Sequence, residues 1–179
     1  MKGMEKNLQR FALWAAGDLT GNRMRGLYAE WLLAARLGLL NSDSTRVEWD
    51  MADIRFGNTL IEVKTSGIMQ QWSVSPTAPR FSIAPQNVVW DAASNVTKKL
   101  SEPARTSHLY VFCLHRSEEL TNSSVLAETN WQFWVVPTRV LDAECANQKS
   151  IGLSGLDTLA ERLDLDQAVS AITKFRHQV

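Results

Sequence analysis

The sequence predicts an α/β fold in which a mixed β-sheet is flanked by helices. Apolar residues recur at helical spacing over residues 22–40, which predicts an amphipathic helix. Polar and apolar residues alternate over residues 53–65 around a central Gly-Asn pair, a pattern typical of two strands joined by a tight turn. Residues 108–115 and 131–137 are almost continuously apolar, as strands covered on both faces are. Together these elements predict a mixed sheet covered by helices.

Length and composition favour one domain over residues 1–179. The chain has 179 residues, of which 45% are hydrophobic and 21% charged, and its formal net charge is zero. At roughly 150 residues per domain, this is one domain with a sizeable core. The zero net charge excludes a polybasic coat for nucleic acid but allows a local basic patch.

The distribution of apolar residues predicts a protein without membrane association. No run approaches the roughly 20 apolar residues that cross a bilayer, and the apolar stretch at residues 11–16 is too short for a signal peptide. Cys113 and Cys145 each lie in an apolar stretch. Two cysteines cannot form a disulfide framework, so we expect buried free thiols in a reducing compartment, the cytoplasm.

The first predicted helix spans residues 22–40. Asn22 is an acceptable N-cap, and the helix should stop near Gly38 to Asn41, because Gly38 and Asn41 both tolerate the left-handed conformation that ends many helices. The apolar stripe expected to face the core consists of Leu27, Trp31, Ala34, Ala35 and Gly38.

Three strands are predicted after this helix. Residues 45–49 form a short strand, and residues 53–65 form a hairpin with Gly57-Asn58 as its turn. This turn sets the register, so that Ile54 pairs with Ile61.

The remaining elements follow from apolar runs and prolines. Proline interrupts the chain between residues 66 and 90. The predicted elements are a possible strand at 80–84, a short helix around 94–101, strands at 108–115 and 131–137, and helices at 138–145 and 154–175, the last with a break near Asp164. Lys98, Lys99 and Arg105 are expected at a solvated helix end, with phosphate contact as the alternative.

The predicted hairpin brings three charged residues together. Its register places Asp53 opposite Glu62, and Lys64 lies two residues further along the same face. Two facing carboxylates repel unless a cation lies between them, and Mg²⁺ is held by one or two carboxylates plus water. A neighbouring lysine orients or deprotonates the attacking water, and the ion polarises a phosphoryl oxygen. This is a constellation for phosphodiester hydrolysis.

Asp53, followed nine positions later by Glu62-Val63-Lys64, resembles the motif of the PD-(D/E)XK nuclease superfamily, which includes many restriction enzymes and Holliday-junction resolvases. The resemblance covers roughly residues 22–72. It implies a restriction-endonuclease-like αβββαβ core in which Asp53, Glu62 and the backbone carbonyl of Val63 bind Mg²⁺. It also implies a supporting Glu30 on the preceding helix.

The same resemblance implies a Mg²⁺-dependent endonuclease that acts on DNA, with Mn²⁺ as a substitute ion. It suggests a role in phage defence or DNA processing, and it matches Gln70 to a glutamine that relatives carry shortly after the lysine. The chain departs from the family pattern because Ala52, not proline, precedes Asp53. Moreover, the segment after Lys64 is rich in proline where the family core has a helix.

Several alternatives stay open at this level. Asp50 competes with Asp53 as the metal ligand if the strand carries a bulge, and Gln71 competes with Gln70. A cysteine or histidine hydrolase would rest only on Cys113 and His115. A non-catalytic binding or assembly subunit with the same fold is the main alternative function, because the zero net charge is unusual for a free-standing nuclease.

The chain is expected to act as a homodimer or with a partner protein, because a single site of this type cuts one strand. Trp131 and Trp134 lie three residues apart on one predicted strand. They therefore point to opposite faces, and we expect one to be exposed and to anchor an interface.

Overall fold

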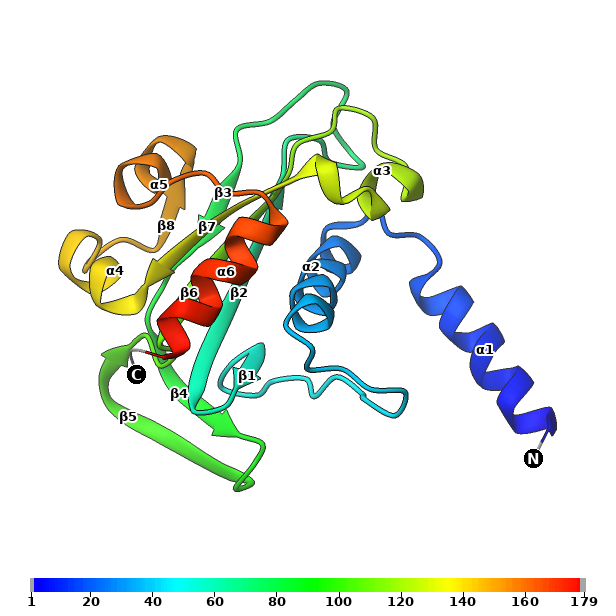
Figure 1. The fold of residues 1–179 in the computed structure, drawn as a ribbon, viewed down its shortest axis with the longest axis horizontal. Coiled ribbons are helices and arrows are strands. Elements are labelled where there is room, and N and C mark those ends of the chain that lie inside the picture. The colour runs from blue at the N-terminus through cyan, green and yellow to red at the C-terminus, as the bar shows by residue number, and fades with distance from the viewer. Residues whose placement is uncertain (1, 178–179) are drawn as a thin grey trace.

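The computed structural model describes residues 2–177 (Figure 1). The helices are α1 (Lys2–Ala16), α2 (Asn22–Arg36), α3 (Asn122–Leu126), the 3₁₀ turn η1 (Glu128–Asn130), α4 (Thr138–Glu144), α5 (Leu153–Leu159) and α6 (Leu165–Arg176). The strands are β1 (Ile54–Phe56), β2 (Thr59–Gly67), β3 (Arg80–Ser82), β4 (Gln86–Asp91), β5 (Val96–Ala104), β6 (Leu109–His115), β7 (Trp131–Pro137) and β8 (Ser150–Gly152).

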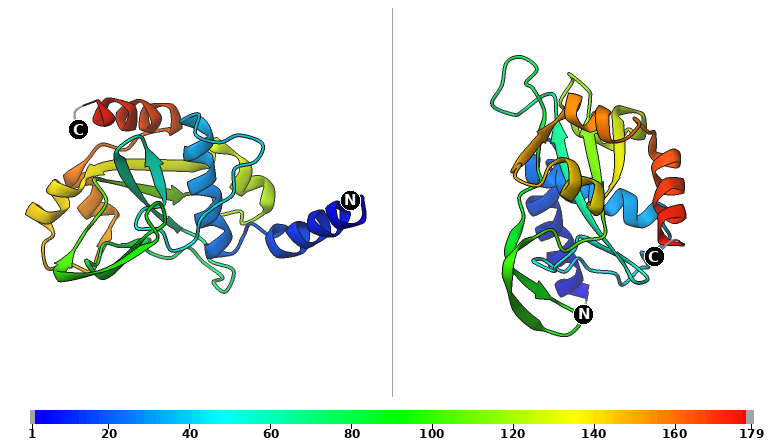
Figure 2. Two further views of the ribbon diagram at one scale, coloured as in Figure 1. Left: turned by 90° about the horizontal axis from the view of Figure 1, so that it is seen from below. Right: turned by 90° about the vertical axis from the view of Figure 1, so that its left-hand side faces the viewer.

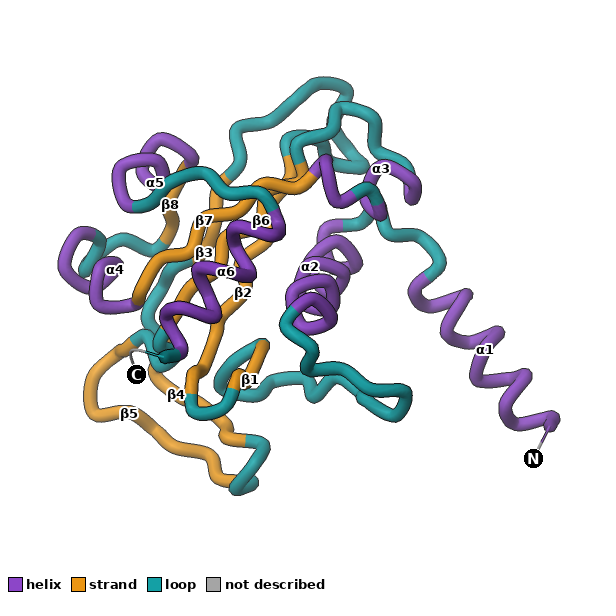
Figure 3. The backbone as a smooth tube through the Cα atoms, in the orientation of Figure 1, coloured by secondary structure: helices purple, strands orange, loops and turns teal. Residues whose placement is uncertain are grey.

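A mixed sheet lies at the centre, with the strand order β1-β2-β6-β7 (Figure 3). β1 and β2 are antiparallel, β2 and β6 are parallel, and β6 and β7 are antiparallel. Two small ribbons, β3 with β8 and β4 with β5, lie outside this sheet. The predicted class, a mixed sheet with flanking helices, is confirmed.

Helices cover both faces of the sheet. α2 and α6 pack on one face, around residues such as Leu33, Val111 and Ile172. On the other face, α4, α5 and the β3–β8 ribbon pack against residues such as Phe112 and Trp134. Figure 2 shows α6 on one side of the central strands. The polar side chains of a sheet with two covered faces are therefore confined to its ends and edges.

The tryptophans of β7 correct one expectation. Trp131 and Trp134 point to opposite faces, as predicted, but both are buried, with 3% and 0% of their surface exposed. Both are buried because helices cover each face. Neither tryptophan is available to anchor an interface, so this basis for a homodimer is lost.

The hairpin confirms the predicted register. Ile54 pairs with Ile61, Arg55 with Leu60 and Phe56 with Thr59. Gly57 has φ +63°, whereas Asn58 does not lie in the left-handed region. A glycine with positive φ at the first central position is the pattern of a type II′ turn.

α2 differs from expectation at its start and in its buried face. Gly21, not Asn22, is the N-cap, and the helix ends at Arg36 before Gly38, whose φ is +70°. Trp31 of the expected stripe is 55% exposed. The buried residues are Arg25, Ala29, Leu32, Leu33 and Ala34. The face of α2 that carries Arg25 is buried because the Arg25 guanidinium donates hydrogen bonds to the Met69 carbonyl and the Gln70 side chain.

Two predicted elements are wrong. Residues 45–49 form a loop, not a strand, because their apolar side chains Val47 and Trp49 find no core and are exposed. Residues 94–101 are not a helix but belong to the β4–β5 ribbon. Lys98 pairs with Val89 across this ribbon, and Asn95 with φ +53° forms its turn.

The C-terminal half follows the prediction closely. β6 and β7 occupy the two apolar runs, β3 lies within the predicted strand, and α4 ends one residue before the predicted Cys145. The break expected near Asp164 is the N-cap of α6, where the Asp164 side chain accepts from Gln167 N–H. Both cysteines are buried and free.

The connection from β2 to β6 differs from the αβββαβ core. Over the described residues 68–108 it contains β3, β4 and β5 but no helix. The face that a crossover helix would cover is packed instead by α4 and α5. None of the helices described in residues 2–177 is both long and apolar enough to span a bilayer.

Candidate functional site: a carboxylate pair at the open edge of β2

Asp53 lies at the point where β1 stops covering β2. β1 pairs with β2 only as far as Ile61, so the edge of β2 is open from there onward. The Asp53 carboxylate fills this edge, and its Oδ2 accepts a 2.7 Å hydrogen bond from the N–H of Val63. Because the N–H and C=O of one strand residue point to the same side, the Val63 carbonyl is also turned toward Asp53.

Glu62 and Lys64 lie beside this edge on one face of β2. They alternate with Ile61 and Val63, which pack under α2 and α6, and so point to the opposite face. Lys64 Nζ forms an ion pair with Glu62 Oε1. Ser107 Oγ, directly before β6, donates to Glu62 Oε2 at 3.3 Å.

The electrostatics of the site favour a cation. The pKa of Asp53 rises to about 7, first because the carboxylate is taken out of water and then because Glu62 and Glu30 are negatively charged. The Val63 N–H and the Lys64 ammonium lower this pKa but do not reverse the rise. Because burial and the neighbouring carboxylates make the ionised form of Asp53 unfavourable, a cation bound beside it would stabilise that form.

Glu30 approaches the site from α2. Its carboxylate accepts 2.6 Å and 3.3 Å hydrogen bonds from the Arg46 guanidinium, and it raises the pKa of Asp53 through its charge. Arg46 also interacts electrostatically with Asp53. The predicted placement of Glu30 near the site is therefore observed, with Arg46 as its direct partner.

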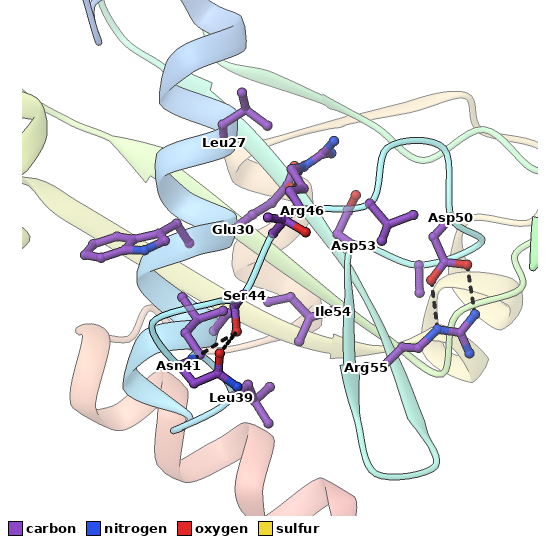
Figure 4. A pocket seen from close by; sticks show the side chains of 16 residues that line it. Leu27, Glu30, Leu39, Asn41, Ser44, Arg46, Asp50, Asp53, Ile54 and Arg55 are labelled. Carbon is purple, nitrogen blue, oxygen red and sulfur yellow. Dashed lines mark hydrogen bonds and ion pairs between the residues drawn. The ribbon is translucent and has the colours of Figure 1, made fainter. Parts of the chain in front are cut away.

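A pocket of about 350 Å³ opens beside these side chains. Figure 4 shows Glu30, Arg46 and Asp53 in its wall, with Asp50 turned away toward Arg55. The rest of the wall is largely apolar and includes Leu27, Trp31, Ala34, Leu39, Leu40 and Val47. The pocket thus places an apolar surface next to a carboxylate that can bind a cation.

Asp50, the alternative ligand, is already neutralised. Arg55 donates to both of its oxygens at 2.8 Å, and the N–H groups of Met51 and Ala92 donate to Oδ1. The Arg55 hydrogen bonds lower the pKa of Asp50 below its ordinary value. Asp50 therefore ties the loop before β1 to the β4–β5 ribbon, and Asp53 is the better candidate for a metal ligand.

Gln70 contacts a different part of the molecule. Its Oε1 accepts from Arg25 at 2.9 Å and its Nε2 donates to the Gly67 carbonyl at 3.0 Å. Gln71 binds Asp18 and Thr20 instead. Both glutamines fasten the segment after β2 to the residues around the start of α2, and neither is hydrogen-bonded to the carboxylate pair.

The donor set fits Mg²⁺ but not a densely ligated metal. Within residues 2–177, no three His, Cys, Asp or Glu side chains lie close enough to form a metal cluster. Two carboxylates and one carbonyl remain, namely Asp53, Glu62 and Val63. Mg²⁺ is bound in this way because it prefers hard oxygen ligands and keeps several waters.

Sequence reasoning missed Arg46 and Ser107. Arg46 belongs to the segment predicted as a strand, and its position depends on how the loop after α2 folds back over Glu30. Ser107 reaches Glu62 only because β6 lies parallel to β2. No local pattern in the sequence marks either residue.

The other candidate side chains have structural partners. Arg105 is buried and donates to Asp142 and to the carbonyls of Ile83 and Cys145, so it does not lie at a solvated helix end. Lys98 and Lys99 are exposed on β5. Burial raises the pKa of the Cys113 thiol well above its ordinary value, which makes it a poor nucleophile.

Searches against protein-family models, curated proteins and solved structures each found no match.

Proposed function

We propose that this protein is a Mg²⁺-dependent endonuclease that hydrolyses phosphodiester bonds in DNA. The observation that carries this proposal is the carboxylate pair Asp53–Glu62 at the open edge of β2, with the Lys64 ammonium beside it. Carboxylates that hold a divalent ion next to a lysine are suited to in-line attack on a phosphate.

The arrangement of the elements supports the resemblance to PD-(D/E)XK nucleases. A helix that carries Glu30 precedes a hairpin that carries Asp53, Glu62 and Lys64, and β6 lies parallel to β2. Two departures from the αβββαβ core are the loop at residues 45–49 and the helix-free connection at 68–108. They lie outside the hairpin that forms the proposed metal site.

Each residue has a distinct role in the proposed reaction. Asp53, Glu62 and the Val63 carbonyl would hold Mg²⁺, or Mn²⁺ in its place. When bound, the ion supplies positive charge to the phosphate and to the attacking oxygen. Lys64 orients the water and stabilises the negative charge that develops on the phosphate. Arg46 keeps Glu30 neutralised at the mouth of the pocket.

The second candidate function is a non-catalytic binding or assembly subunit with the same arrangement of elements. The formal net charge of zero favours it, because DNA affinity depends mainly on cationic contacts with phosphates. The two functions differ in one respect that is easily measured, namely whether the protein cleaves DNA.

Plasmid cleavage by the purified protein tests the proposal. We expect nicked or linear DNA with Mg²⁺ or Mn²⁺, and intact DNA with Ca²⁺ or EDTA. Lys64→Ala should abolish cleavage and retain most DNA binding, because it removes the group that acts on water and leaves the carboxylates in place. Lys149→Ala, which removes an exposed lysine between α4 and β8, is the matched control and should cleave at the wild-type rate.

Two results would count against the nuclease. Wild-type protein that binds DNA without cutting it under any of these metals supports the assembly subunit. Cleavage that persists at the wild-type rate in Lys64→Ala would show that the activity does not come from this site.

A further inference from the structure

α1 stands apart from the rest of the described molecule. It projects from the body on the short linker that precedes α2 (Figure 1), and every residue from Gly3 to Ala16 is exposed. The exposed residues include Met4, Leu8 and Phe11, which show 75%, 66% and 60% of their surface to solvent. The body of the protein therefore does not explain why this segment is helical.

A helix of this kind is marginal by itself. Isolated helices of about 12–15 residues are barely stable in water, and helices in proteins gain most of their stability from packing an apolar face. α1 has 15 residues. Its stability therefore requires a surface that covers its apolar side chains.

Four of the apolar side chains of α1 form a narrow seam. Met4, Leu8, Phe11 and Ala15 follow one another at spacings of four, three and four residues, which places them on one line along the helix. Glu5, Lys6, Gln9 and Arg10 lie away from this line. Spacing that alternates between three and four is the pattern of a coiled-coil seam.

We propose that α1 pairs with α1 of a second copy of this chain in an antiparallel, two-fold symmetric contact. The large and small residues of the seam complement each other in this arrangement. Met4 lies opposite the partner's Ala15, and Leu8 lies opposite the partner's Phe11. Antiparallel pairing also aligns the helix dipoles favourably.

The position of α1 favours the antiparallel direction as well. The body is attached at the C-terminal end of α1 (Figure 1). In an antiparallel pair the two bodies lie at opposite ends of the contact. A parallel pair would instead bring both bodies, and Lys6 and Arg10 of both helices, to the same level.

The exposed apolar area of α1 is large enough for a weak but specific dimer interface. The seam with its flanking Trp14 offers roughly 500–600 Å² of apolar surface per helix, since aromatic residues contribute about 150–250 Å² each. Two helices then bury about 1,000–1,200 Å², the low end of specific interfaces. We therefore expect dimerisation in the micromolar range.

A membrane surface is less suited than a second copy of α1 to cover the apolar seam. Helices that lie on membranes combine the apolar face with a strongly basic polar face. In α1, Lys2, Lys6 and Arg10 are basic and Glu5 offsets one of them, so basic residues do not dominate the polar side of this helix. The pairing uses α1 alone, so it does not depend on the proposed nuclease activity.

Sedimentation velocity on the full chain, from about 1 to 100 µM, tests the pairing. Wild-type protein should shift from monomer to dimer over this range. Leu8→Glu should weaken the dimer by roughly a hundredfold or more, because each dimer loses two buried leucines. Leu13→Glu is the matched control: Leu13 is equally exposed but lies off the seam, so this variant should dimerise like wild type.

Three outcomes would overturn the proposal. One is a wild-type protein that stays monomeric throughout the range. The second is an equal loss of dimer in Leu8→Glu and Leu13→Glu, which indicates unspecific apolar attraction. The third is a monomer that cosediments with phosphatidylserine vesicles, which assigns α1 to a membrane. Thermal melting of both variants checks that the body, from which α1 projects, still folds.

Discussion

At the scale of single residues, Asp53 carries a partly buried carboxyl group with a strongly raised pKa. Its carboxylate is partly removed from water beside two other carboxylates, and its pKa rises to about 7. Asp50, only three residues earlier, has a pKa below its ordinary value because Arg55 binds it. Two aspartates of one short segment thus have opposite effects on stability as the pH changes.

The first prediction concerns the pH dependence of unfolding without metal. An acid whose pKa is higher in the folded protein destabilises it progressively as the pH rises from the unfolded pKa to the folded one. For Asp53 this interval runs from about 4 to about 7. Asp53→Asn should therefore be more stable than wild type by an amount that grows across this interval, to at most about 4 kcal/mol.

Urea unfolding in EDTA at several pH values measures this effect. Asp50→Asn should change the free energy of unfolding in the opposite direction. A carboxylate whose pKa is lower in the folded protein stabilises that protein at pH values above its unfolded pKa. This variant should be less stable than wild type, most clearly at neutral pH. A stability difference for Asp53→Asn that does not change with pH would contradict the electrostatic description of the site.

The second prediction concerns stabilisation by Mg²⁺. When the Mg²⁺ concentration is ten times the Kd, an ion that binds only the folded protein stabilises it by about 1.4 kcal/mol. In a domain of this size, each kcal/mol of added stability raises Tm by roughly 2–4 °C. Asp53→Asn should lose most of this increase and Asp50→Asn should keep it. The opposite result in a thermal-shift assay would move the metal ligand to Asp50.

At the scale of elements, the β1–β2 hairpin was the most predictable part of the site. A Gly-Asn turn between alternating residues sets the register locally, and the observed pairing agrees. Residues 94–101 were not predictable in the same way, because their strand conformation depends on pairing with β4. The buried face of α2 depends on Arg25, a charged residue that a search for apolar periodicity leaves out.

The third prediction tests the turn. Gly57→Ala puts a side chain on a residue with φ +63°, and its Cβ would lie 3.2 Å from Arg176 Nε. We expect a loss of about 1–2 kcal/mol in unfolding free energy and weaker Mg²⁺ binding, because the turn aligns Asp53 with Glu62.

Gly26→Ala is the matched control for this substitution. Gly26 lies inside α2, and a Cβ there meets nothing within 4 Å. The same change should stabilise the protein by about 0.5–1 kcal/mol. Equal effects of the two variants in urea unfolding would show that the turn does not demand a glycine.

At the scale of the whole molecule, the helices that pack on one face of the central sheet are not those that the sequence indicated. The expected crossover helix is replaced by α4 and α5, which follow β7. Long-range packing of this kind has no local signal. For the same reason Arg46 and Ser107 were missed, and Gln70, expected to support the metal site, contacts Arg25 instead. The carboxylate pair was predictable because it depends only on the hairpin.

The central claim is that Asp53 and Glu62 share one divalent ion. A crystal grown with Mn²⁺ tests it directly, because manganese gives an anomalous signal that locates the ion. We expect one peak bound by the Asp53 and Glu62 carboxylates and the Val63 carbonyl, absent from Asp53→Asn crystals. A peak at Asp50 and Asp91, or no peak at the edge of β2, would contradict the account.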